Sequence, residues 1–184
     1  FTLFHVQGET YQSFQPRFST RYLLGRNLSA KVSYTKMNQY IHLLSNSYIS
    51  QPTDIWVPVT GNIRPMHAHQ VTSGLFWHYK ELDFSVEGYY KRMNNLVEYK
   101  DNGPVLPSFT GWEDRVGVGK GRSYGLELMV QKKTGRFNGW IGYTLSWSDR
   151  WFPDGTVNKG RRFPSKYDNR HKVDIVASYK LSKK

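Results

Sequence analysis

Apolar and polar residues alternate along this chain in segments of about ten residues, and this pattern limits the possible folds more than any other feature of the sequence. In residues 82–90, for example, the apolar side chains stand at even numbers, and Tyr89 is the one aromatic residue at an odd number. Side chains alternate between the two faces of a β-strand, so each segment predicts a strand with one apolar and one polar face. We count about seven such segments, within residues 14–24, 28–35, 70–79, 82–91, 123–131, 141–148 and 172–181.

The connections between these segments alternate between short and long. Three span only a few residues, at 25–27, 80–81 and 134–138, and three are long, at 38–66, 100–115 and 150–170. Antiparallel barrels that cross a membrane have short turns at one end and long loops at the other, whereas a soluble β-sandwich has no reason to place every long loop at one end. We therefore expect residues 38–66 and 150–170 to lie at the same end, opposite the turns.

Composition is compatible with a membrane barrel. The hydrophobic fraction is 38% and the mean hydropathy is −0.64, and the absence of any run of 18 apolar residues excludes a transmembrane helix. These values do not exclude a barrel, because only alternate residues of a barrel strand face lipid. Aromatic residues make up 16% of the chain, and they stand near the ends of the apolar faces, where membrane barrels carry aromatic girdles. These residues are Tyr22, Tyr34, Tyr79, Tyr90, Tyr124 and Trp147.

The predicted fold is all-β, an antiparallel up-and-down transmembrane β-barrel segment. The alternative is a soluble β-sandwich or half-closed barrel whose apolar faces form an interior core. The two differ in where the apolar faces point, since the membrane fold turns them outward. The faces that test this are Leu28, Ala30, Val32 and Tyr34 in one strand, and Ile141, Tyr143, Leu145 and Trp147 in another.

Five stretches, in order along the chain, resemble one known family. They are residues 31–40 (KVSYTKMNQY), 88–93 (GYYKRM), 121–127 (GRSYGLE), 139–148 (GWIGYTLSWS), and 162–164 (RFP) followed by 167–171 (YDNRH). Together they resemble the β-barrel of TonB-dependent receptors of the Bacteroidetes type. The resemblance covers most of the chain from about residue 14 onward.

The resemblance implies a barrel of about 22 strands closed around a plug domain and driven by the TonB complex. Residues 1–184 would then be about seven strands of that barrel domain without the plug. The chain starts at Phe1 without Met, and we expect an internal piece whose targeting signal lies upstream. The implied function is import of a nutrient, a siderophore, vitamin, glycan or peptide, across the bacterial outer membrane. The expected partners are the rest of the barrel, the plug, TonB, outer-membrane lipid and the nutrient.

Motifs for metal binding, nucleotide binding and catalysis are weak. His67 and His69 share one face of a strand, a spacing that can chelate a metal, but no third ligand is near in sequence. Residues 117–121 (GVGKG) lack the first Gly and the Ser or Thr of a phosphate loop, so a flexible strand entry is the better interpretation. The adjacent acids Glu113 and Asp114 are typical of solvated loops. We therefore expect no enzyme activity, no cofactor and no metal, and the absence of Cys excludes a thiolate site.

The net charge of +12 comes from basic residues spread over polar faces and loops, so nucleic-acid binding is not favoured. One group differs. Arg92 continues the apolar parity beyond Tyr90, and Lys120 and Arg122 continue it before Tyr124. These three cations are predicted to face outward and to contact lipopolysaccharide, although ordinary solvated charges are the alternative.

Long loops supply the candidate ligand-binding residues Trp56, Trp112, Trp151, Arg161 and Arg162. In the alternative function, a soluble β-rich carbohydrate-binding module, the three Trp side chains would be exposed and would stack on sugars. Detergent dependence separates the two functions. A last motif, Tyr167, Asp168, Arg170 and His171, is expected to be structural, with Asp168 pairing with Arg170 where the loop enters a strand.

Overall fold

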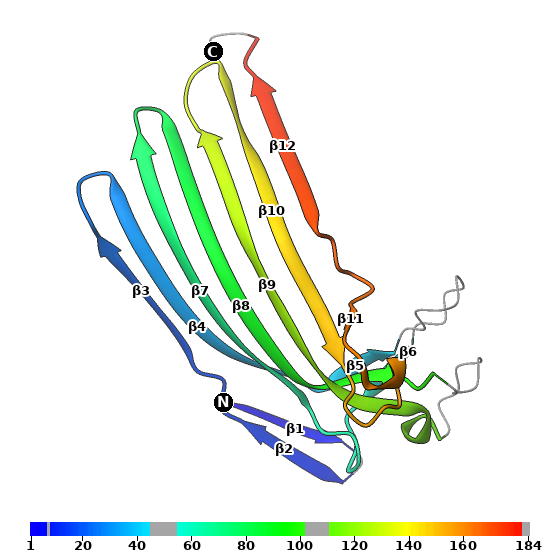
Figure 1. The fold of residues 1–184 in the computed structure, drawn as a ribbon. Helices are drawn as coiled ribbons and strands as arrows, with labels where there is room; N and C mark the ends of the chain where they lie inside the picture. Colours follow the sequence, from blue (N-terminus) through cyan, green and yellow to red (C-terminus); the bar gives the residue numbers. More distant parts are fainter. Residues whose placement is uncertain (7, 45–54, 102–110, 182–184) are drawn as a thin grey trace.

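The computed structural model describes residues 1–6, 8–44, 55–101 and 111–181. Its main body is one antiparallel sheet of eight strands in which sequential long strands are neighbours (Figure 1). The strands of this sheet are β3 (Arg17–Leu23), β4 (Leu28–Gln39), β7 (Met66–Tyr79), β8 (Leu82–Tyr99), β9 (Val116–Lys132), β10 (Phe137–Trp151), β11 (Phe163–Pro164) and β12 (His171–Tyr179). No helix among the described residues is long and apolar enough to cross a membrane.

All smaller elements gather at one end of the sheet. They are the hairpin of β1 (Thr2–Val6) and β2 (Glu9–Ser13), the hairpin of β5 (Ile41–Leu44) and β6 (Ile55–Pro58), and the short 3-10 helices η1 (Glu113–Arg115) and η2 (Asn158–Gly160). The tight turns lie at the opposite end (Figure 1). For the described residues, the predicted placement of the loops within 38–66 and 150–170 is confirmed; residues 45–54 lie outside the described part.

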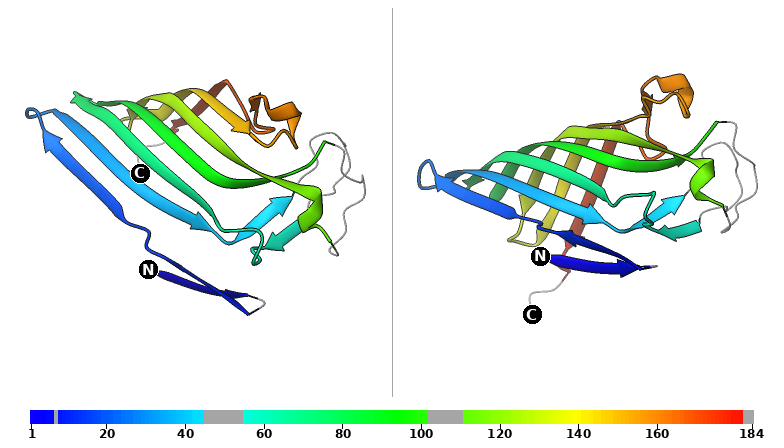
Figure 2. Two further views of the ribbon diagram at one scale, coloured as in Figure 1. Left: turned by 60° about the horizontal axis from the view of Figure 1, so that its bottom comes forward. Right: turned by 90° about the horizontal axis from the view of Figure 1, so that it is seen from below.

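The apolar positions of neighbouring strands fall into register. One row of directly opposed residues crosses all seven long strands and contains only Ala, aliphatic and Tyr side chains: Tyr22, Ala30, Leu75, Val86, Leu128, Tyr143 and Val173. Val86 is 45% exposed and Val173 is 60% exposed. Within the described chain the sheet is a single curved layer (Figure 2). The apolar faces of Leu28–Tyr34 and Ile141–Trp147 are therefore not covered by a second layer, as the membrane fold predicts and the sandwich does not.

The buried core lies at the loop end. One cluster joins the β5–β6 hairpin to the ends of β8 and β9, and consists of Leu44, Val57, Ile63, Val97, Trp112 and Val116. A second cluster consists of Leu96, Phe152 and Val157. Phe152 is fully buried because it lies on Gly119, whose Cβ, if it had one, would be 2.6 Å from Phe152 Cδ1.

Several strands differ from the predicted ranges. The β1–β2 hairpin was not predicted, and Phe14 lies before β3. Strand β8 continues to Tyr99 through a bulge at Asn95, whose φ of 57° is left-handed. Residues 117–121 belong to β9 and do not form a flexible entry. Cross-strand pairing holds them in the sheet, although alternating Gly residues remove the apolar pattern on one face.

Candidate functional site

The outer face of the sheet has the height of a thin membrane. On β8 its apolar positions run from Leu82 to Tyr90, about 27 Å along the strand at about 3.4 Å per residue. Strands of membrane barrels tilt by about 40°, which reduces this to about 20 Å along the membrane normal, close to the typical apolar band of about 25 Å.

The strand register supports such a tilt. Leu23 and Ser29 flank the first turn, and their row contains Ser85 of β8. The second turn begins farther along the sheet, because it is flanked by Leu82, three residues before Ser85 on β8. The third turn lies farther still: Leu82 is in one row with Gly139, and Phe137 beside the turn is two residues past that row. The hairpin ends therefore step along the sheet, as Figure 1 shows. This stagger is what a tilted barrel wall requires.

Aromatic side chains mark both edges of the apolar band. Near the loop end, the Tyr124 ring stacks between Tyr90, at 6.3 Å, and Trp147, at 5.3 Å between ring centroids. Near the turns, Trp77 stacks on Tyr79 and on Phe84, each at 5.3 Å. These stacks lie where the two girdles of a membrane barrel are found.

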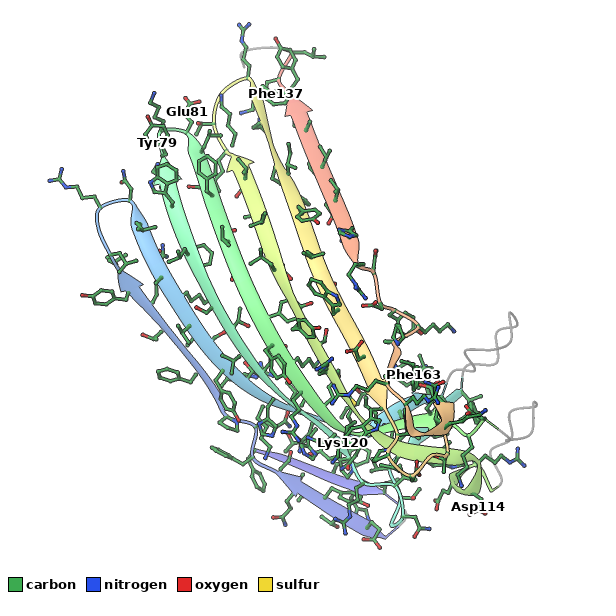
Figure 3. The ribbon with its side chains drawn as sticks, viewed as in Figure 1. Tyr79, Glu81, Asp114, Lys120, Phe137 and Phe163 are labelled. Carbon is green, nitrogen blue, oxygen red and sulfur yellow. The ribbon has the colours of Figure 1, made fainter. Side chains whose placement is uncertain are left out.

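Basic residues occupy the rows directly beyond the loop-end aromatics. Arg92 stands opposite Arg122 on one side and opposite His69 on the other, and His69 stands opposite Lys36. Lys120 lies one outward position farther along β9 (Figure 3). Arg92, Lys120 and Arg122 thus share the outward parity that the sequence predicted for them.

A groove forms among these cations. It has a volume of about 280 Å³ and is lined by residues that include Arg92, Lys120, Arg122, Trp151 and Arg162. Lys120 Nζ lies 5.8 Å from the centroid of the Trp151 ring, and Arg162 Cζ lies 5.5 Å from it. The ring is held in place because Trp151 Nε1 donates a hydrogen bond to the Gly160 carbonyl at 3.0 Å.

One carboxylate is part of this groove. Asp149 accepts hydrogen bonds from Arg122, with Nε at 3.0 Å and Nη2 at 2.9 Å from Oδ2. Arg150 also lines the groove, but it pairs with the buried carboxylate of Glu98. In the described part of the chain, no carboxylate lies within ion-pair distance of Arg92, Lys120 or Arg162.

The loop residues proposed as ligand contacts are not brought together as a set. Trp56 is 61% exposed on β6, whereas Trp112 is only 7% exposed and belongs to a core cluster. The expectation that Trp112 is an exposed stacking platform is therefore wrong, because its indole fills the space between the β5–β6 hairpin and β9. Trp151 and Arg162 meet on the outer face, and Arg161, which precedes Arg162 in the sequence, is exposed.

The last loop is fastened to β10 by the residues named in the sequence motif. Asp168 Oδ1 accepts a hydrogen bond from the Ser148 backbone at 2.8 Å, and Arg170 Nη2 lies 3.1 Å from Asp168 Oδ2. The Arg170 guanidinium lies 5.0 Å from the Trp147 ring centroid. His171 Nδ1 is 2.8 Å from the Tyr143 hydroxyl, and Tyr167 is exposed.

The remaining sequence candidates form no reaction centre. His69 Nδ1 is 2.8 Å from the Tyr34 hydroxyl, and the His67 ring lies edge-on to His69 at 5.9 Å. The described residues contain no group of three or more side chains that could hold a metal ion. Glu113 Oε2 accepts a hydrogen bond from Asn62 at 2.7 Å, as an exposed loop acid does.

Comparison with known proteins agrees with this architecture. Residues 3–182 match the family model described as TonB dependent receptor-like, beta-barrel. No curated protein and no solved structure matches the chain. The family match covers nearly the whole chain, including every strand of the main sheet. The protein therefore belongs to the TonB-dependent receptor β-barrel family, whose members are outer-membrane transporters.

Proposed function

We propose that residues 1–184 form part of the barrel wall of a receptor that captures a nutrient with its long loops and imports it with energy from TonB. The observation that carries this proposal is the uncovered apolar face, which runs in register across seven strands. Exposed rows of this length would be unstable in water and are stable against lipid. The nutrient class, a siderophore, vitamin, glycan or peptide, is a prediction, and so is the Bacteroidetes type of receptor.

The two open edges of the sheet support a larger barrel around this segment. Strands β3 and β12 are the last long strands of the sheet, and neither pairs on its outer side with another described strand. Open edges of this kind expose unpaired backbone groups, which a membrane barrel removes by closure. We propose that further strands of the receptor pair with β3 and β12, and that a plug domain and TonB act from parts of the receptor outside these residues.

Uptake measurements test the transport proposal. Cells that lack the receptor, cells that lack TonB and wild-type cells are each given radiolabelled members of the four nutrient classes. We expect one class to enter wild-type cells and to be lost equally in both mutants. Uptake of every class that is unchanged by loss of the receptor would contradict the proposal.

A pair of Trp variants tests whether the loops of this chain contribute to nutrient binding. Trp56→Ala removes an exposed loop aromatic, whereas Trp112→Ala removes a buried one. If the loops capture the nutrient through exposed aromatics, Trp56→Ala weakens binding without lowering the unfolding temperature. Trp112→Ala lowers the unfolding temperature instead, because it leaves a cavity in the core.

A further inference from the structure

The basic groove stands at a defined height relative to the apolar band. Arg92 is two residues beyond Tyr90 on the same face of β8, which is about 7 Å along the strand and about 5 Å along the membrane normal. Lys120 is one outward position higher on β9. Both side chains therefore start at the level where hydrocarbon gives way to lipid headgroups.

Positive charge at this level exceeds negative charge. Arg92 and Arg122 stand directly opposite each other on β8 and β9, and like charges in such a pair destabilise a sheet. Asp149 compensates only Arg122. Arg92, Lys120 and Arg162 have no described carboxylate as partner. These neighbouring positive charges repel each other in the sheet alone. A multivalent anion in the groove would make their positions favourable, because it can accept charge-assisted hydrogen bonds from several of them.

The cations are also held in place. Arg122 is fixed by Asp149 and lies 5.5 Å from the Tyr124 ring centroid. Lys120 and Arg162 both contact the Trp151 ring. Side chains that are already ordered lose less conformational entropy when they bind a ligand. Lys120 and Arg122 of β9 and Arg162 of the β10–β11 loop are thus ordered before an anion binds, and Arg92 of β8 lines the same groove.

Cations of the turn end are paired only in part. Lys132 and Lys133 are neutralised by Glu81 at 2.9 Å and by Asp83 at 2.7 Å, whereas the described residues give Lys80 and Arg136 no ion pair. The height of the groove therefore decides the ligand, because the headgroups at the loop end belong to the outer leaflet. In an outer membrane this leaflet contains a glycolipid that carries several phosphate groups in one headgroup.

We propose that the groove of Arg92, Lys120, Arg122 and Arg162 binds the phosphate groups of lipopolysaccharide in the outer leaflet. Guanidinium groups suit this ligand because they donate paired hydrogen bonds to phosphate oxygens. The site faces lipid and lies on the opposite side of the wall from the lumen. It is therefore independent of the imported nutrient and goes beyond the proposed transport function.

The test measures glycolipid binding to the complete receptor in neutral detergent by native mass spectrometry. The double variant Arg92→Gln/Lys120→Gln removes two cations that form no ion pair among the described residues. We expect its Kd for bisphosphorylated lipid A to rise at least about tenfold, from the loss of charge-assisted contacts. The control Lys31→Gln/Lys91→Gln removes two cations from the opposite face of β4 and β8, and we expect its Kd to stay within about twofold of wild type.

Two further ligands separate the source of the anion. Dephosphorylated lipid A should bind the wild type no more tightly than phosphorylated lipid A binds the double variant. Pyrophosphate should bind much more weakly than the glycolipid. Equal binding of phosphorylated and dephosphorylated lipid, equal losses in variant and control, or pyrophosphate binding as tight as lipid A would each overturn the proposal.

A loop variant keeps the test decisive if the double variant folds poorly. Arg162→Gln lies outside the long strands and should weaken lipid A binding while leaving the unfolding temperature unchanged. An unchanged Kd in this variant would contradict the assignment of Arg162 to the site. Nutrient binding to the detergent-solubilised receptor should be the same for the wild type and for Arg92→Gln/Lys120→Gln, which separates failure of this site from failure of the transport proposal.

Discussion

Leu128 provides the sharpest energetic test of the lipid-facing wall. It stands opposite Val86, midway between Leu82 and Tyr90 of the neighbouring strand, so it lies near the centre of the apolar band. An Arg side chain at the midplane of a membrane barrel costs about 2–4 kcal/mol. Leu128→Arg should therefore reduce the ratio of folded to unfolded receptor by about 30- to 700-fold, at tenfold per 1.4 kcal/mol.

The matched control is the neighbouring residue. Glu127 points to the other face and stands opposite Glu87, so Arg at position 127 meets a carboxylate and no lipid. Both variants are introduced into the complete receptor, and urea unfolding in bilayers is followed by tryptophan fluorescence. We expect Glu127→Arg to change the free energy of unfolding by less than about 1 kcal/mol. Equal losses in the two variants would refute the assignment of the faces.

Three other perturbations follow from local geometry. Gly119→Ala should lower stability by about 1–3 kcal/mol in thermal unfolding, because the added Cβ would lie 2.6 Å from Phe152; an unchanged midpoint would contradict this packing. Burial lowers the pKa of His42 below its ordinary value of 6.5, so the folded state takes up fewer protons than the unfolded state. Stability of the loop-end core should therefore fall as the pH drops below about 6.5, and hydrogen exchange in residues 41–44 should become faster. Exchange rates that do not change with pH, after correction for the intrinsic exchange rate, would contradict this prediction. Glu127→Gln should raise stability by about 0.2–1 kcal/mol at low salt by relieving repulsion from Glu87, and this gain should shrink at high salt.

The sequence allowed the strands and their faces to be predicted because the alternation is a local property. Residues 82–91 show this, since each side chain's face follows from parity alone. Parity does not predict the face of a side chain beyond a β-bulge. Asn95 shifts the register of β8, so Leu96 and Glu98 lie opposite Gly119 and Gly117, and no local pattern marks that change.

The composition of the groove could be predicted only in part. The outward direction of Arg92, Lys120 and Arg122 followed from parity, but the proximity of Arg162 depends on how the loop after β10 folds over Trp151. The pairing of Asp149 with Arg122 depends on the register of β9 and β10. Register between strands is set by packing and turn geometry over the whole sheet, and a single sequence read along its length does not reveal it.

Buried loop aromatics show the same limit. Trp112 and Trp56 look alike in the sequence, since both are Trp residues in long connections. The structure buries Trp112 because the β5–β6 hairpin and the ends of β8 and β9 enclose it, whereas Trp56 points away from that cluster. Only the tertiary contacts of each loop decide which aromatic is exposed to a ligand.

The most direct test of the lipid-facing wall is an accessibility scan along β9. The chain contains no Cys, so single Cys residues at positions 126 to 130 can each carry a spin label in the complete receptor, with any Cys elsewhere replaced by Ser. Labels at 126, 128 and 130 should collide with oxygen dissolved in lipid, and labels at 127 and 129 with a water-soluble nickel complex. An accessibility that does not alternate, or that alternates with the opposite parity, would contradict the account of this chain as a barrel wall.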